Sequence, residues 1–90
     1  MTTMGQCVDE CRQCAGLFRL GRDVEAALDM VEVFEGAQQL LMSAPAAIAQ
    51  DWAFVLAKML ECQERQDWLG LADWMEFELI ELLQKARSAN

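Results

Sequence analysis

Three cysteines near the start of the chain, Cys7, Cys11 and Cys14, are the residues best suited to metal or redox chemistry. Thiolates bind soft metals such as Cu(I) and Zn, and Cys62 would complete a set of four ligands. Cysteines at this spacing also fall on one face of a helix, where a buried thiol packs like a small hydrophobic side chain. Because four-cysteine sites are usually built from loops, we expect core packing, reduced thiols and no cofactor. A thiolate metal site is the alternative.

Acid–base chemistry has few candidates, because the chain contains no histidine. Histidine is the side chain most often used for proton transfer near neutral pH, and helical di-iron sites combine it with glutamates. The acids Asp73 and Glu76, and likewise Glu78 and Glu81, share helix faces on which carboxylates are ordinarily solvated. We therefore expect no catalytic residues, and a protein that is not an enzyme.

An aromatic patch near the end of the chain is the best candidate for a partner-binding site. Trp74, Phe77 and Ile80 fall beside the main apolar seam of their helix, and Glu78 interrupts the patch. Tryptophan in apolar surroundings is typical of interface hot spots. A tight bundle could instead bury the same residues against a neighbouring helix. We predict that Trp74, Phe77 and Ile80 bind a partner, with Glu78 available for an interfacial salt bridge.

Composition limits the kind of partner. The 90 residues carry a formal net charge of −8, and 54% of them are hydrophobic. Nucleic acids and anionic membranes attract basic surfaces, so neither is expected as a partner. A small domain with this much apolar content is expected to bury part of it against another protein or a second copy. The first residues lack the pattern of a secretory signal, and we expect a cytoplasmic protein.

Apolar residues recur at helical spacing along the whole chain, which contains one proline and no alternating run typical of a strand. We expect Gly21 to end the first helix and Asp23 to cap the second. Short connections favour an antiparallel bundle, so residues 1–90 are expected to form a single all-α domain. The pattern predicts four helices, or three if the last two are continuous: from a Thr2 or Thr3 cap to Leu20, then residues 24–42, 46–65 and 68–87.

The apolar stripes also predict which side of each helix faces the core. The third helix has two adjoining stripes and is expected to be central, with neighbours on both sides. For the second helix, the inward positions are predicted to be Ala27, Leu28, Val31, Phe34, Gln38 and Leu41. For the third, they are Ile48, Trp52, Val55, Met59 and Cys62 on one stripe, and Ala49, Ala53, Leu56 and Leu60 on the other.

Parts of the chain resemble known proteins. The residues FRLGRDVEAA (18–27), FEGAQQLL (34–41) and ERQDWLGLADWMEFEL (64–79) are similar to a group of small, poorly characterised bacterial helical proteins. Size and acidity are loosely similar to the helical chaperones of flagellar and type III export. The resemblance implies a chaperone that masks an amphipathic segment of its partner.

These observations together predict a non-enzymatic protein-binding module. The alternatives are a homodimeric structural or regulatory protein, and a thiolate metal-binding bundle.

Overall fold

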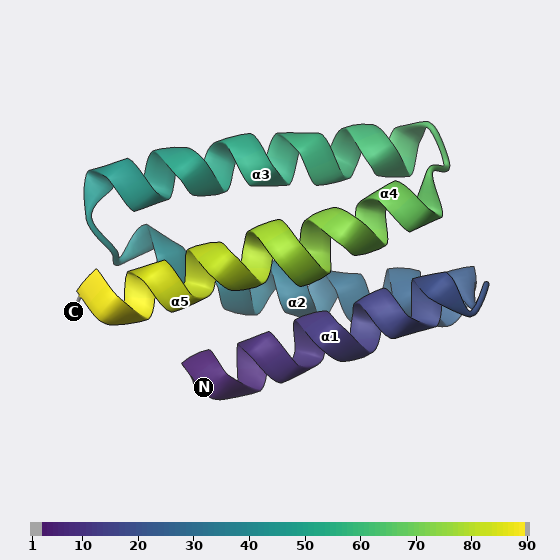
Figure 1. Ribbon diagram of the computed structural model, residues 1–90, viewed down its shortest axis with the longest axis horizontal. Helices are drawn as coiled ribbons and strands as arrows, with labels where there is room; N and C mark the ends of the chain where they lie inside the picture. Colours follow the sequence, from purple (N-terminus) through teal and green to yellow (C-terminus); the bar gives the residue numbers. More distant parts are fainter. Residues whose placement is uncertain (1–2, 90) are drawn as a thin grey trace.

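The computed structural model describes residues 3–89, and every element in that range is helical. Three separate helices are followed by a continuous helical rod in which a π-helical segment joins two α-helical ones (Figure 1). The all-α fold class and the four helices predicted from the sequence are confirmed. The elements are α1 (Met4–Arg19), α2 (Asp23–Met42), α3 (Ala46–Glu64), α4 (Trp68–Asp73), η1 (Trp74–Leu79) and α5 (Ile80–Ala89).

Two of the predicted helix ends are formed as expected. The Thr3 hydroxyl accepts a hydrogen bond from the Gln6 backbone N–H at 3.1 Å, and the Gln6 side chain accepts one from the Thr3 N–H at 3.0 Å. This reciprocal pair is a capping box that fixes the start of α1. Gly21 follows α1 with a φ of 76°, a conformation that glycine adopts without steric cost.

The start of α2 differs from the prediction. Asp23 is the first residue of the helix, and Arg22 occupies the cap position without a side-chain hydrogen bond. The Asp23 carboxylate therefore does not cap the helix, although its charge still suits the positive end of the helix dipole. The break before the rod is clear, because Gln66 has a φ of 58° and the Asp67 side chain accepts the Gly70 N–H at 3.0 Å. The third and fourth helices are therefore not continuous.

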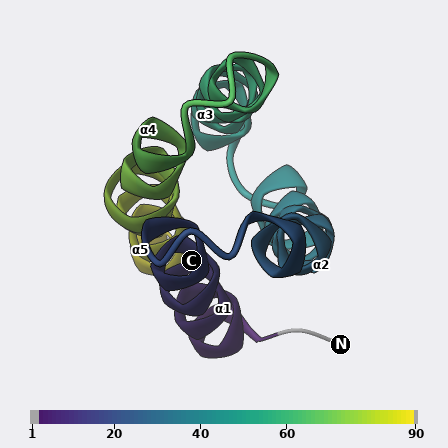
Figure 2. The ribbon, with the colours of Figure 1, turned by 90° about the vertical axis from the view of Figure 1, so that its right-hand side faces the viewer.

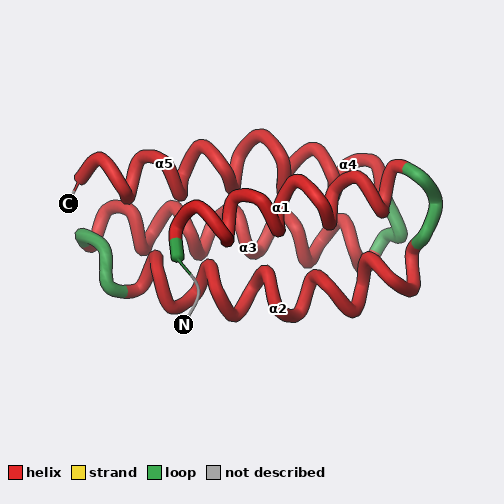
Figure 3. Tube along the Cα trace, turned by 90° about the horizontal axis from the view of Figure 1, so that it is seen from below, coloured by secondary structure: helices red, strands yellow, loops and turns green. Residues whose placement is uncertain are grey.

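The helices form an antiparallel bundle whose three connecting turns lie at its two ends (Figure 3). Seen along the bundle, α1 lies between α2 and the rod, while α3 packs on the other edge of the rod (Figure 2). Helices α2 and α3 are therefore the outer pair on one side of the molecule. Within residues 3–89, no helix combines the length and the apolar character needed to cross a bilayer.

The core side of α2 is rotated from the one that the sequence indicates: Leu41 is buried as predicted and Ala27 and Phe34 are half-buried, but Gln38 is exposed. Leu28 and Val31, both predicted to face inward, are 69% and 57% exposed. The helix is apolar on two sides, and the side with the smaller residues packs against α1. There, the Cys14 thiol comes close enough to donate a hydrogen bond to the Ala26 carbonyl oxygen at 3.3 Å. The buried residues of α2 are Ala26, Met30, Val33, Gly36, Ala37 and Leu41.

Helix α3 also departs from the prediction on one side. Its first stripe is buried from Ile48 to Met59, with Cys62 half-buried. On the second stripe, Ala53 and Leu60 are exposed, while Ala49 and Leu56 are half-buried. Helix α3 is therefore not central: it buries one side against the bundle and leaves the other open.

Candidate protein-binding surfaces

The cysteine stripe of α1 lies in the core. Cys7, Cys11 and Cys14 are fully buried, and Cys62 on α3 is half-buried. Burial raises the pKa of Cys14 to about 12, with a smaller contribution from Asp29. The neighbouring Cys11 thiol lowers the pKa of Cys7, and the Cys7 thiol together with burial raises that of Cys11. Among the described residues, no group of three or more cysteine, aspartate or glutamate side chains is placed to hold a metal ion.

The residues of the predicted aromatic patch differ in their exposure to solvent. Trp74 is half-buried, Phe77 is 57% exposed and Glu78 is exposed, but Ile80 is only 6% exposed. Ile80 therefore belongs to the core and is not available to a partner. The physical reason is the π-helical segment Trp74–Leu79, whose wider turns rotate the residues that follow it, so the α-helical spacing that grouped Ile80 with Trp74 and Phe77 does not hold.

Phe77 is partly covered by a cation from another helix. The Arg19 guanidinium of α1 lies 5.7 Å from the centre of the Phe77 ring. The same guanidinium forms ion pairs with Asp73 at 2.8 Å and Glu76 at 2.5 Å. These hydrogen bonds raise the pKa of Arg19. The contacts tie α1 to the rod, which gives Phe77 and Arg19 a structural role.

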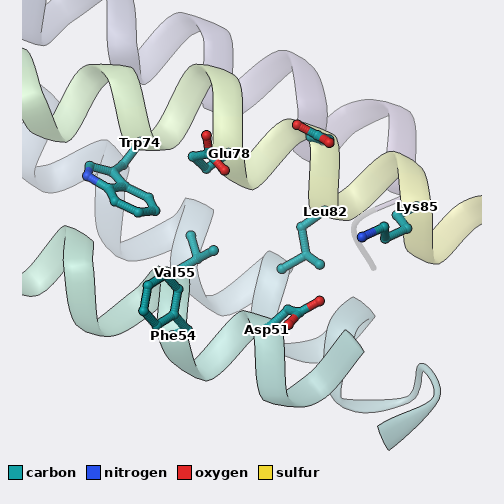
Figure 4. A pocket seen from close by; sticks show the side chains of 8 residues that line it. Asp51, Phe54, Val55, Trp74, Glu78, Leu82 and Lys85 are labelled. Carbon is teal, nitrogen blue, oxygen red and sulfur yellow. The ribbon is translucent and has the colours of Figure 1, made fainter. Parts of the chain in front are cut away.

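Trp74 and Glu78 come together at a cavity between α3 and the rod (Figure 4). The Trp74 ring meets the Phe54 ring of α3 edge to face, with centroids 6.1 Å apart. We call this hollow of about 290 Å³ the aromatic–acidic cavity. Sequence reasoning missed Phe54 because it lies on neither apolar stripe of its helix. The cavity is lined by Asp51, Phe54, Val55, Trp74, Glu78, Glu81, Leu82 and Lys85.

A second and larger hollow lies on the other side of α3. It has a volume of about 480 Å³, and none of the residues lining it is charged. At its base the Trp52 indole N–H donates a hydrogen bond to the Gln38 side-chain oxygen at 2.8 Å. We call this hollow the α2–α3 groove. It is lined by Gln38, Met42, Ala46, Ala49, Gln50, Trp52, Ala53 and Leu56.

Exposed apolar residues extend both walls of the α2–α3 groove. On α2, Val24 and Val31 precede Gln38 at intervals of seven residues, so all three share one helix face. On α3, Leu60 continues the stripe of Ala53 and Leu56. Nine large apolar side chains are exposed in the described part of the chain, and four of them lie on α2 and two on α3. The sequence marked three of these residues, Leu28, Val31 and Leu60, as parts of apolar stripes, but it assigned them to the core.

Comparison with models of protein families, with curated proteins and with solved structures gives no match.

Proposed function

We propose that this protein is a non-enzymatic protein-binding module that holds an amphipathic helix of a partner in the α2–α3 groove. The observation that carries the proposal is an uncharged groove whose two walls continue as exposed apolar stripes. An amphipathic helix laid in such a groove buries residues at intervals of three and four. It would cover the sides of α2 and α3 that the bundle leaves open.

Charge favours a basic partner over a second copy of the chain. Glu35 follows Val31 by four residues on α2, and Glu64 follows Leu60 by four residues on α3, so each apolar stripe continues into an exposed carboxylate. Neither carboxylate takes part in an ion pair within the described range. Two copies, each with a net charge of −8, repel one another. A helix with an apolar face and basic flanks complements the uncharged groove and the carboxylates that follow its apolar stripes.

Within this class of function, we propose a chaperone of the export type. Such a protein covers the amphipathic segment of a subunit until the subunit assembles. The small size, the acidity and the open groove between two helices all support this role.

The groove can be tested with one substitution on each side of α3. Ala53 lines the groove and is exposed, whereas Ala47 is exposed but is not among the lining residues. Ala53→Arg fills the groove with a long cationic side chain, and Ala47→Arg adds the same side chain elsewhere on the helix. The probe is a fluorescent amphipathic helix made of leucine and lysine, followed by anisotropy at low salt, and circular dichroism checks that both variants fold.

We expect Ala53→Arg to weaken binding of the probe by at least about tenfold, or about 1.4 kcal/mol, and Ala47→Arg to leave it nearly unchanged. Equal binding by both variants would exclude the groove as the site. Light scattering over a concentration series tests the homodimer. A tight dimer that Ala53→Arg converts to a monomer would assign the groove to a second copy and refute binding of a foreign helix.

A further inference from the structure

The aromatic–acidic cavity is a separate feature from the α2–α3 groove. Ala53 and Phe54 are neighbours on α3, yet Ala53 lines the groove and Phe54 lines the cavity. The floor of the cavity is apolar, because Val55 and Leu82 are only 6% and 5% exposed. Its side walls are the rings of Phe54 and Trp74, which come from α3 and η1 (Figure 4). A ligand in this cavity would contact the two aromatic rings and the buried apolar side chains of the floor.

The charged groups around the cavity are not balanced. Among the residues that line it, Asp51, Glu78 and Glu81 supply three carboxylates against the single ammonium of Lys85. Lys58 reaches the Phe54 ring from outside this lining, and its ammonium is paired with Glu61 at 3.8 Å. In the described part of the chain, none of the four lining groups forms an ion pair. Other acids do find partners within the fold, for example Asp73 and Glu76 with Arg19. The cavity therefore has an unmatched negative charge, which favours a cation.

The aromatic wall also suits a cation. The Lys58 ammonium already lies 5.6 Å from the centre of the Phe54 ring, so this ring is accessible to a positive charge. Tryptophan is the strongest of the aromatic side chains in cation–π attraction. Trp74 and Glu78 are four residues apart within the π-helical segment, and they bring a ring and a carboxylate to the same cavity. π-Helical turns occur frequently at functional sites.

We propose that the aromatic–acidic cavity binds an organic cation, a guanidinium or ammonium group on an alkyl chain. The alkyl chain packs on Val55 and Leu82, the charged group faces the carboxylates, and the rings of Phe54 and Trp74 flank it. Pockets for small ligands start at about 300 Å³, so a volume of about 290 Å³ fits a group the size of one arginine or lysine side chain. A free amine and a basic side chain of another protein share this chemistry. The proposal does not depend on the use of the α2–α3 groove.

The test uses agmatine as a guanidinium probe and pentanol as a neutral probe of similar chain length. The indole N–H signal of Trp74 in a nitrogen–proton NMR spectrum reports binding, and Trp74→Phe assigns that signal among the three tryptophans. Glu78→Gln removes one carboxylate from the cavity. Glu32→Gln is the matched control, since Glu32 is exposed on α2, away from the cavity, and the two substitutions change the net charge equally.

We expect agmatine to shift the Trp74 signal in a saturable way, and pentanol to shift it much less. Glu78→Gln should weaken agmatine binding about fivefold, which is the effect of one partly exposed charge pair, while Glu32→Gln leaves it unchanged. The absence of a saturable shift, equal binding of pentanol, or equal weakening by the two variants would each overturn the proposal.

A second arm of the experiment identifies the source of the cation. It compares agmatine with a short peptide containing one arginine, and with the same peptide containing citrulline in its place. Tighter binding of the arginine peptide than of agmatine assigns the site to a protein side chain. Tighter binding of agmatine assigns it to a free amine. Equal binding of the arginine and citrulline peptides refutes recognition of a side-chain cation. Ala53→Arg should change none of these results, so failure here and failure of the groove are distinguishable.

Discussion

Two valines of α2 provide a direct test of how this helix is rotated in the bundle. Val31 is 57% exposed and Val33 is 1% exposed, although the sequence favours Val31 as the inward residue. Val→Ala removes the same two carbons at each position, and it improves helix propensity equally, by about 0.5 kcal/mol. The difference between the two variants therefore isolates burial.

The expected magnitudes follow from the two exposures. At Val33, loss of two buried carbons costs about 1.6 kcal/mol of transfer free energy, and the cavity left behind adds about 1 kcal/mol. After the gain in helix propensity, Val33→Ala should lower the free energy of unfolding by about 2 kcal/mol. At Val31 less than half of the side chain is buried, so the transfer loss and the propensity gain nearly cancel.

Urea unfolding followed by far-ultraviolet circular dichroism measures both values. With a slope of about 1 kcal/mol per molar urea, the midpoint for Val33→Ala should fall by about 2 M, while that for Val31→Ala should hardly move. Repeating the measurement at two protein concentrations controls for self-association through α2. A larger loss for Val31→Ala would show that α2 buries the side favoured by the sequence, and equal losses would show that both sides are buried alike. In either case the α2–α3 groove would not exist as described.

Three further predictions concern the thiols and the turns. A thiol reagent added to the folded protein should modify Cys62 before the buried cysteines of α1, with all four thiols reacting in urea, as counted by mass spectrometry. The pKa of Cys14 is about 12 in the folded protein, against an ordinary value of 9.0. Above pH 9.0 the thiol ionises more readily in the unfolded chain, so the free energy of unfolding is unaffected below pH 9.0 and falls as the pH rises towards 12. Urea midpoints measured across this range should therefore fall less steeply for Cys14→Ala than for the unmodified chain. Gln66→Gly should raise the free energy of unfolding by about 0.5–1 kcal/mol in the same assay, because Gln66 has a φ of 58°, whereas Gly21→Ala, at a φ of 76°, should lower it.

The sequence predicted the buried side of a helix correctly where the helix has one apolar side. Where a helix has two apolar sides, the prediction was poor. Helix α1 buries Cys7, Cys11 and Cys14 as expected, because the rest of its surface is largely polar and offers no competing side. Helix α2 has apolar residues on both sides of its axis, and periodicity alone does not distinguish the side that meets α1. The small residues Gly36 and Ala37 are a usable signal, since they permit a close approach of another backbone.

The candidate sites were partly predictable for a different reason. Trp74 and Glu78 were identified from their types, and both line the aromatic–acidic cavity. Ile80 was misplaced because helical periodicity assumes an α-helix throughout, and the π-helical segment changes the direction of every residue after it. Phe54 was missed because its role depends on a residue of the rod that is distant in sequence. Contacts of that kind follow from the tertiary fold and not from local spacing.

The exposed apolar residues of α2 and α3 are not the remains of an incomplete core. Each of the four helices contributes fully buried side chains, among them Phe18, Leu41, Met59 and Leu79. The bundle is therefore closed without Val24, and polar substitution of the exposed residues would remove little buried area. One apolar side on each helix is enough to form this core. The second apolar sides of α2 and α3 therefore require a separate explanation. The proposed contact with a partner helix would account for the apolar character of Val24, Val31 and Leu60, which extend the two walls of the α2–α3 groove.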